Sequence, residues 1–281
     1  MSEEFDIPEL MAVVLSRYIK DGDIMFQGAA TPLPMVAIEL AKARGVDITY
    51  FSAFGINPNQ PINFSFLLTQ GFKYANSIKC TSELHALPMW EQWSKGRLSL
   101  EFLRPAQIDK YFNCNNTVVY GEEKNYHKPA VRLPGGMAVS DAINLMERTI
   151  LYTTRHIKRN VVDTVDFLMC KGYPLSEWRK KNKMGTGCAA FVTNLCVFEP
   201  DPKTSMMKLK SIHPGITIDD VIENTGFKIE KMDYPVTPAP TSKELKLLRE
   251  DIDPLGYREM DFPSLRNNVM VRVANKGVNF T

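Results

Sequence analysis

The spacing of apolar residues along the chain predicts helices that alternate with strands. Leu10, Val13 and Val14 recur every three to four residues, which is typical of a helix that packs one face on a core, and short apolar runs bounded by glycine indicate strands. The predicted helices cover residues 7–19, 35–43, 82–95, 139–146, 219–224 and 241–252, and the predicted strands cover 24–26, 46–51, 98–103, 149–152, 160–167, 188–198 and 207–212.

This alternation predicts an α/β fold, with an open and mostly parallel sheet flanked by helices. A chain of 281 residues can form one large α/β domain or two smaller ones. We predict a single domain over residues 1–256. Residues 257–281 are polar, and we expect them to form a tail that packs on a partner or frays.

Composition narrows the class of protein. The hydrophobic content of 44% and charged content of 23% are ordinary for a soluble globular protein. A formal charge of +2 does not indicate nucleic-acid binding. No apolar run is long enough to cross a membrane, and the acidic N-terminus does not resemble a signal peptide. We therefore expect a cytoplasmic protein.

Cysteine and histidine spacing predicts neither disulfides nor a metal site. The five cysteines are odd in number, scattered and without CxxC spacing, which favours reduced thiols. The four histidines do not pair at the i, i+4 spacing of a metal-binding helix. A basic run at residues 155–159 indicates a solvated hairpin face, with contact to a nucleotide phosphate as the alternative.

Two glycine turns are candidate binding elements. Gly28 follows an apolar strand, and ligands of open α/β sheets bind at the carboxyl ends of strands; a plain tight turn is the alternative. Gly135 and Gly136 follow a proline, where the backbone can approach another group closely. If a helix begins near Met137, its free N–H groups can hold an anion or a developing oxyanion. Pro-Gly-Gly by itself is only a turn.

Four motifs in register make the chain resemble the β-type subunit of family I coenzyme A transferases, such as glutaconate CoA-transferase. They are IKDGD with a later PLP at residues 19–34, AQIDKYFNCN at 106–115, the segment from Lys-Pro to Gly-Gly at 128–136, and SIHPGITIDDVIENTGF at 211–227 with LKLLREDIDP at 245–254. The resemblance implies a CoA-transferase-type α/β fold. It also implies an α-type partner subunit, in a heterodimer or an α2β2 heterotetramer, with an active site between the two subunits.

The sequence departs from this family where the family carries its nucleophile. The resemblance places a glutamate after the second strand, where it attacks the acyl-CoA and carries CoA as a thioester. The run at residues 48–55 reads ITYFSAFG and contains no acid. Asp47 lies too early, and the next acid, Glu83, is separated by a long loop.

A sister group of two-subunit hydrolases, which open a ring of a steroid-derived CoA thioester, also lacks this glutamate, and HALPMWEQWSKGR resembles that group.

Three hypotheses for the function remain. The first is a hydrolase that cleaves a carbon–carbon bond of a cyclic β-dicarbonyl CoA thioester by activated water. The second is a true acyl-CoA:carboxylate CoA-transferase. The third is a non-catalytic scaffold subunit that completes a CoA pocket. None requires a cofactor beyond the coenzyme A of the substrate.

Candidate site residues follow from these motifs. Gln107 and Asn113 can offer amide donors to a thioester carbonyl or stabilise their own turn. Ser52 stands in the nucleophile's region without a visible base, and Glu123 is either a general base or a solvated loop acid. The residues expected to contact substrate or CoA are Gly28, Ala53, Phe54, Gly135, Gly136, Met137 and Ala138.

Overall fold

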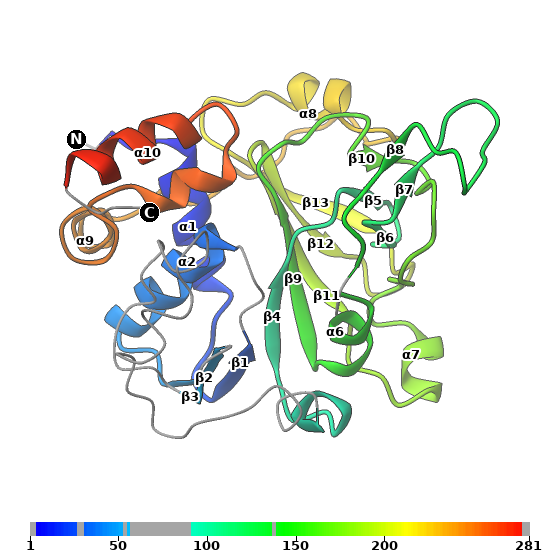
Figure 1. Cartoon of the computed structure of the whole chain (residues 1–281), viewed down its shortest axis with the longest axis horizontal. Helices are drawn as coiled ribbons and strands as arrows, with labels where there is room; N and C mark the ends of the chain where they lie inside the picture. The colour runs from blue at the N-terminus through cyan, green and yellow to red at the C-terminus, as the bar shows by residue number, and fades with distance from the viewer. Residues whose placement is uncertain (1–3, 27–30, 53–54, 57–90, 137–138, 277–281) are drawn as a thin grey trace. The chain divides into compact units, whose positions relative to one another are not determined.

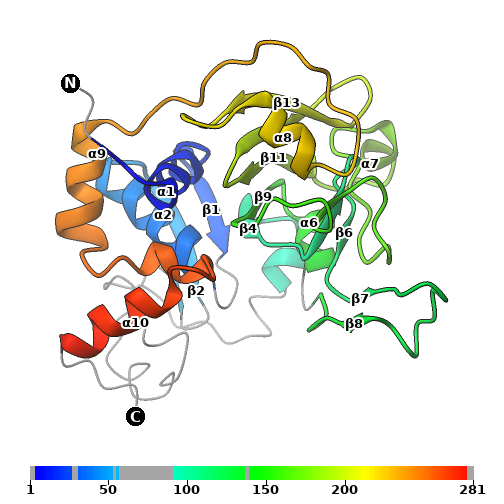
Figure 2. The ribbon, with the colours of Figure 1, turned by 90° about the horizontal axis from the view of Figure 1, so that it is seen from above.

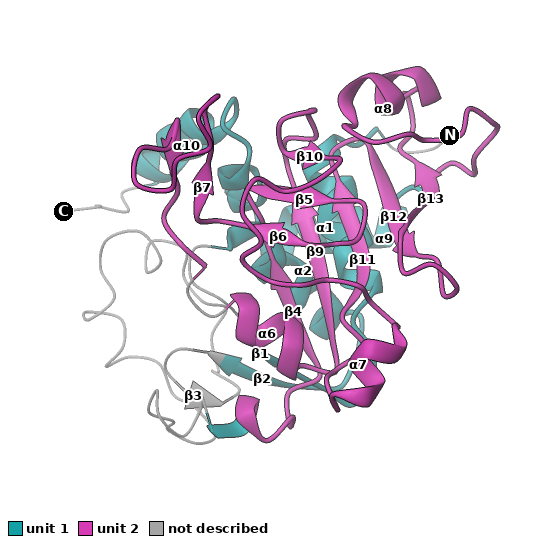
Figure 3. Cartoon of the chain, turned by 90° about the vertical axis from the view of Figure 1, so that its right-hand side faces the viewer, with its two compact units in different colours: residues 1–92, 238–281 teal, residues 93–237 magenta. Residues whose placement is uncertain are grey.

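The computed structural model describes residues 4–26, 31–52, 55–56, 91–136 and 139–276. The chain forms two compact units: residues 1–92 with 238–281, here called unit 1, and residues 93–237, here called unit 2 (Figures 1 and 3). The prediction of a single domain over residues 1–256 stays a prediction.

Unit 1 combines both ends of the chain. Strand β1 (Asp23–Phe26) pairs in parallel with β2 (Ile48–Ser52), and β2 pairs antiparallel with β3 (Gly55–Ile56). Helices α1 (Ile7–Arg17) and α2 (Pro32–Ala43) pack on each other. The C-terminal part adds α9 (Ser242–Lys246), the π-helix η1 (Leu247–Ile252), the 3-10 helix η2 (Tyr257–Asp261) and α10 (Arg266–Asn275).

The sheet of unit 2 is parallel in the middle and antiparallel at one edge. Strands β4 (Leu100–Leu103), β9 (Arg148–Thr153) and β11 (Cys188–Thr193) pair in parallel in that order, and β12 (Cys196–Pro200) and β13 (Met207–Ile212) continue antiparallel. Helices α6 (Val139–Leu145), α7 (Glu177–Lys181) and α8 (Ile218–Asn224) complete this part.

Two smaller sheets carry the AQIDKYFNCN motif and the segment after it. Strand β5 (Gln107–Asp109) lies between β10 (Val161–Val162) and β6 (Cys114–Asn115). Strands β7 (Val118–Val119) and β8 (Val131–Arg132) form a hairpin, whose loop projects from the rest of unit 2 (Figures 1 and 2). The predicted α/β class, with an open and mostly parallel sheet flanked by helices, is confirmed.

Several predicted elements differ in detail. The apolar run at 188–198, which predicts one strand, forms two antiparallel strands. The hydroxyl of Thr193 accepts hydrogen bonds from the N–H groups of Leu195 and Cys196, both at 3.0 Å, and so turns the chain between them. Of the strand predicted at 160–167, only β10 forms. Of the helix predicted at 82–95, residues 91–94 are helical and residues up to 90 lie outside the described part.

Helices α8 and α9 each begin at a capping box. Thr241 caps α9 and Thr217 caps α8, each in a capping box with the acid three residues later. Residues 257–275 form η2 and α10 within unit 1, with Val269 and Val273 buried. Packing of residues 257–281 on a partner stays a prediction.

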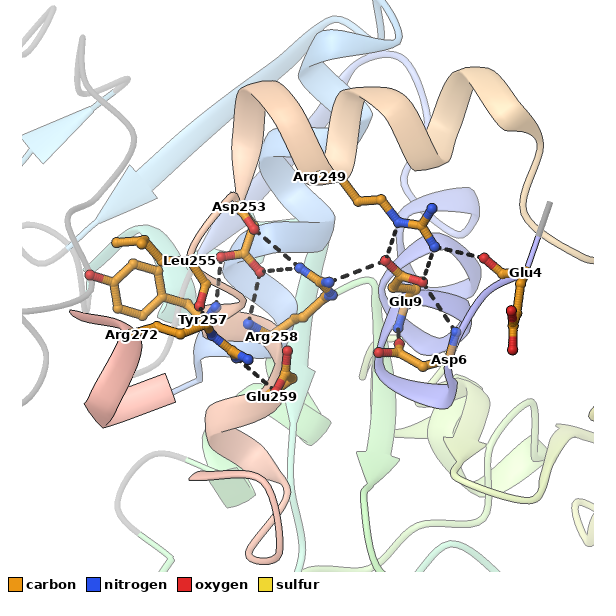
Figure 4. A network of polar contacts seen from close by, with 10 residues as sticks. All are labelled: Glu4, Asp6, Glu9, Arg249, Asp253, Leu255, Tyr257, Arg258, Glu259 and Arg272. Atoms are coloured by element: carbon orange, nitrogen blue, oxygen red, sulfur yellow. Dashed lines mark hydrogen bonds and ion pairs between the residues drawn. The ribbon is translucent and has the colours of Figure 1, made fainter. Parts of the chain in front are cut away.

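A buried ion network ties the N-terminal helix to the C-terminal segment (Figure 4). Glu9 accepts hydrogen bonds from Arg249, at 2.7 and 2.8 Å, and from Arg258 at 3.1 Å. Arg258 also donates to Asp253 at 3.0 Å. Burial raises the pKa of the Glu9 carboxyl, but the bonds from Arg249 and from the backbone of Asp6 outweigh it, so that the pKa is lowered. Glu9 is therefore a charged group held inside unit 1.

We expect Glu9→Gln to lower the free energy of unfolding by about 2–4 kcal/mol, because Arg258 loses a buried counter-charge. Glu250→Gln is a matched control from the neighbouring π-helix. Glu250 is exposed and lies 4.0 Å from Lys246, so its loss should change stability by less than about 0.5 kcal/mol. Urea unfolding of the two variants measures both values. A loss for Glu9→Gln as small as that for Glu250→Gln would show that the Glu9 network adds no stability.

Candidate functional site

The AQIDKYFNCN motif forms a buried hydrogen-bond network in unit 2. Gln107 donates from Nε2 to Oδ2 of Asp166 at 3.0 Å and to the carbonyl of Arg159 at 3.3 Å. Its Oε1 accepts from Nδ2 of Asn115 at 2.7 Å and from the N–H of Asp166 at 3.2 Å. Both donors and both lone pairs of the Gln107 amide are therefore used inside the protein.

Asp109 and Asn113 close the turn between β5 and β6. Oδ1 of Asp109 accepts from the N–H groups of Tyr111 and Asn113, and Oδ2 accepts from Nδ2 of Asn113 at 2.9 Å. Oδ1 of Asn113 accepts from the N–H of Gly172 at 2.8 Å. These contacts show Gln107 and Asn113 in the turn-stabilising arrangement; a role toward a thioester carbonyl stays a prediction.

The Gly-Gly turn lies against this network. The N–H of Gly135 donates to the carbonyl of Asn116 at 2.8 Å, and Oδ1 of Asn116 accepts from the N–H of Ala106 at 2.5 Å. Gly135 has φ of +99°, in the left-handed region that favours glycine, and a Cβ on Gly136 would collide with Sδ of Met169 unless that side chain moved. The structure therefore brings together two motifs that are about twenty residues apart in the sequence, and it favours glycine at both positions of the turn.

The other candidate residues lie elsewhere or outside the described part. Glu123 is exposed in the loop between β7 and β8, and Ser52 ends β2 in unit 1. The expected helix after the Gly-Gly turn begins at Val139 as α6. The residues outside the described part are Gly28, Ala53, Phe54, Met137 and Ala138.

The basic run at 155–159, predicted to be a solvated face, contains a buried histidine. The ring of His156 forms hydrogen bonds with the hydroxyls of Thr193 at 3.0 Å and Thr225 at 2.9 Å. His213 is also buried and bonds to Thr237 and to the carbonyl of Thr193. Burial, with a smaller effect of His213, lowers the pKa of His156 to about 3, and burial lowers the pKa of His213 to about 4. Both rings are neutral structural groups.

Glu101 is a buried acid that sequence reasoning missed. It lies in β4, opposite Thr149 of β9 in the parallel register. Oε2 of Glu101 and Oγ1 of Thr149 are both buried and have no hydrogen-bond partner among the described residues. Burial raises the pKa of the Glu101 carboxyl well above its usual range. The signal in the sequence was a single acid inside the apolar run LSLEFL.

Within the described residues, no group of three His, Cys, Asp or Glu side chains is arranged to hold a metal ion. No helix in that part of the chain is long and apolar enough to cross a membrane.

The fold is an open α/β architecture, and in such folds ligands commonly bind beside the carboxyl ends of the parallel strands. The sequence profile of the Coenzyme A transferase family matches residues 9–224, and the chain belongs to this family.

Two relatives and one solved structure are similar to this chain and carry names that state different reactions. The chain is 32% identical, over 86% of its length and 91% of the relative, to a subunit of 3-oxoadipate CoA-transferase from Pseudomonas knackmussii. It is 30% identical, over 55% of its length and 60% of the relative, to the cholesterol ring-cleaving hydrolase IpdB subunit of Rhodococcus jostii. Glutaconate coenzyme A-transferase of Acidaminococcus fermentans has the same fold, with a TM-score of 0.74 and 24% identity over 90% of this chain and 97% of that chain.

The buried histidines predict a loss of stability in acid. The unfolded chain binds protons as the pH falls below the usual histidine pKa of 6.5, whereas the folded protein keeps both rings neutral down to about pH 4. The free energy of unfolding therefore falls as the pH drops below 6.5. Near pH 5 the two histidines together lower it by up to roughly 2–3 kcal/mol per pH unit. We expect His213→Gln to reduce this slope by about half, and the exposed His127→Gln to leave it unchanged, in urea titrations at several pH values. An unchanged slope in His213→Gln would contradict the assignment.

The buried Glu101 predicts the opposite dependence. Its raised pKa keeps a proton in the folded state while the unfolded chain releases it above about pH 4.5, so the cost of burial grows as the pH rises. Glu101→Met should therefore stabilise the protein more at pH 8 than at pH 5, by at least about 1 kcal/mol. The exposed Glu147→Met is the control and should act alike at both pH values. Thermal unfolding at the two pH values measures the difference, and equal effects of Glu101→Met would reject it.

Proposed function

We propose that the chain is the β-type subunit of a heteromeric enzyme that acts on an acyl-CoA thioester and hydrolyses a carbon–carbon bond of a cyclic β-dicarbonyl CoA thioester. The observation that carries this proposal is the run ITYFSAFG at residues 48–55, which contains no carboxylate. A transferase of this family needs a carboxylate there to form an anhydride and then a glutamyl thioester. Hydrolysis uses water as the nucleophile and needs no carboxylate nucleophile at that position.

Ring opening by water follows from simple carbonyl chemistry. A general base removes a proton from water, and the oxygen adds to the ring ketone. The bond between the ketone carbon and the adjacent carbon then breaks, and its electron pair moves into the thioester as an enolate. Backbone N–H donors stabilise the enolate oxygen until a proton returns to carbon. The products are a carboxylate and an open-chain acyl-CoA.

The residues of this chain would contribute positioning and donors. The Gly135–Gly136 turn would let backbone approach the thioester closely, and the carbonyl of Asn116, directly after β6, holds the turn by accepting the N–H of Gly135. Glu123 is exposed in the hairpin loop and is this chain's candidate base. We assign the remaining acid–base groups to an α-type partner, in a heterodimer or α2β2 heterotetramer, and we propose no cofactor beyond the coenzyme A of the substrate.

The relatives support two chemistries. The IpdB subunit is part of a ring-cleaving hydrolase, which favours our proposal. The 3-oxoadipate CoA-transferase subunit matches more of the chain, and it favours acyl-CoA:carboxylate CoA transfer as the second candidate. That candidate requires a carboxylate from the partner or from another loop. A scaffold subunit that completes a CoA pocket is the third candidate.

Product analysis on the co-purified two-subunit complex separates these functions. Cyclic β-dicarbonyl CoA thioesters are incubated in ¹⁸O-water, with and without acetate as acceptor. We expect a ring-opened acyl-CoA that carries ¹⁸O in its new carboxylate and forms without acetate. Transfer of CoA to acetate, only when acetate is present, would replace our proposal with the transferase.

Hydroxylamine gives an independent test of the mechanism. A transferase accumulates an enzyme-bound glutamyl thioester, which hydroxylamine converts to a stable hydroxamate on the protein. We expect no hydroxamate on either subunit after incubation with substrate. A modified glutamate found by peptide mass spectrometry would identify the hidden nucleophile and overturn the hydrolase assignment.

A further inference from the structure

Two buried cysteines face each other across a short antiparallel contact in unit 2. Cys114 of β6 and Cys170 form an antiparallel bridge in which each N–H donates to the other's carbonyl, at 3.2 and 3.4 Å. Residues paired in this way have Cα atoms about 5.5 Å apart, and disulfides form at Cα separations of about 4.4–6.8 Å. The Cα separation of this pair therefore falls within the range of disulfides, and a small approach of the two segments would let the sulfurs bond.

The two thiols are free, and Sγ of Cys114 donates to the carbonyl of Phe112 at 3.5 Å. Cys114 is 0% exposed and Cys170 is 4% exposed, so Cys170 is the sulfur that a small reagent meets first. Interaction with the Cys114 side chain lowers the pKa of Cys170, whereas interaction with Cys170 and burial raise the pKa of Cys114. Cys170 is therefore the better nucleophile of the pair.

A buried arginine favours the thiolate form of Cys170. Arg179 is almost fully buried and donates to the carbonyls of Gly172, Ile143, Gly185 and Lys171 at 2.8–3.2 Å. Among the described residues it has no carboxylate partner, and its positive charge also acts on Cys170. A guanidinium beside a thiol is a recurring feature of reactive cysteines.

We propose that Cys114 and Cys170 are a reversible redox pair that hydroperoxides convert into an intrachain disulfide. The Cys170 thiolate attacks one oxygen of hydrogen peroxide, the O–O bond breaks, and hydroxide leaves to give a sulfenic acid. The sulfur of Cys114 then attacks the sulfur of Cys170 and expels the hydroxyl, which leaves as water with the proton of the Cys114 thiol. Two thiols lose two electrons to one peroxide.

The disulfide would act on the motif network. Cys114 lies between Asn113 and Asn115, and the N–H of Gly172, two residues after Cys170, bonds to Asn113. Met169, next to Cys170, packs where a Cβ on Gly136 would be. A covalent link therefore joins the two segments that support the Gly-Gly turn. This inference does not depend on which reaction the enzyme performs.

Differential alkylation of the co-purified complex tests the pair. The complex is treated with hydrogen peroxide, denatured, alkylated with iodoacetamide, reduced, and alkylated again with N-ethylmaleimide. We expect the iodoacetamide label on Cys114 and Cys170 to be lost together, at least tenfold faster than on Cys188 and Cys196. A peptide that links Cys114 to Cys170 should appear and should disappear on reduction. Burial raises the pKa of both control cysteines to about 12, which makes them poor nucleophiles.

Variants assign the two roles. In Cys114→Ser, Cys170 should accumulate sulfenic acid that dimedone traps; in Cys170→Ser, Cys114 should keep its first label. Cys188→Ser is the matched control and should keep the linked peptide. A link that uses Cys80, or loss of label from Cys114 and Cys170 no faster than from Cys188, overturns the proposal. The wild-type measurement decides the question even if a serine variant does not fold.

Discussion

A buried hydrogen-bond network around Gln107, Asp109 and Asn115 holds the candidate site together. Polar side chains in a protein interior are tolerated when their donors and acceptors are paired, and leaving one unpaired costs about 1–3 kcal/mol. Gln107 and Asn115 meet this requirement by bonding to each other and to backbone groups. Because each partner fixes the next, the short strands β5 and β6 have one register, and Asn116, directly after β6, accepts the N–H of Gly135 in the Gly-Gly turn.

Unit 2 also contains a buried charge that no carboxylate of the described residues neutralises. Arg179 bonds to four backbone carbonyls, and Cys170 lies within its field. Buried charges normally require a partner, because removing them from water is costly. A thiolate on Cys170 supplies one, which links the electrostatics of the fold to the redox chemistry that we propose for the pair with Cys114.

Family membership and reaction are separate questions in this protein. Transferases and a hydrolase are both among its relatives, so the shared family does not select between the two reactions. The distinction rests on one group, the carboxylate that residues 48–55 lack. In the reaction that we propose, water takes the place of a carboxylate as the attacking group, and the Gly-Gly turn is retained.

Local patterns in the sequence were sufficient to predict the α/β class and most helices and strands, because periodicity depends on residues close together in the chain. The burial of His156, the isolation of Glu101 and the pairing of Cys114 with Cys170 came from the folded structure alone. The surroundings of these groups are formed by segments distant in sequence, and no local pattern predicts which strands will pair. Long-range pairing sets burial, and burial sets the protonation state of such groups.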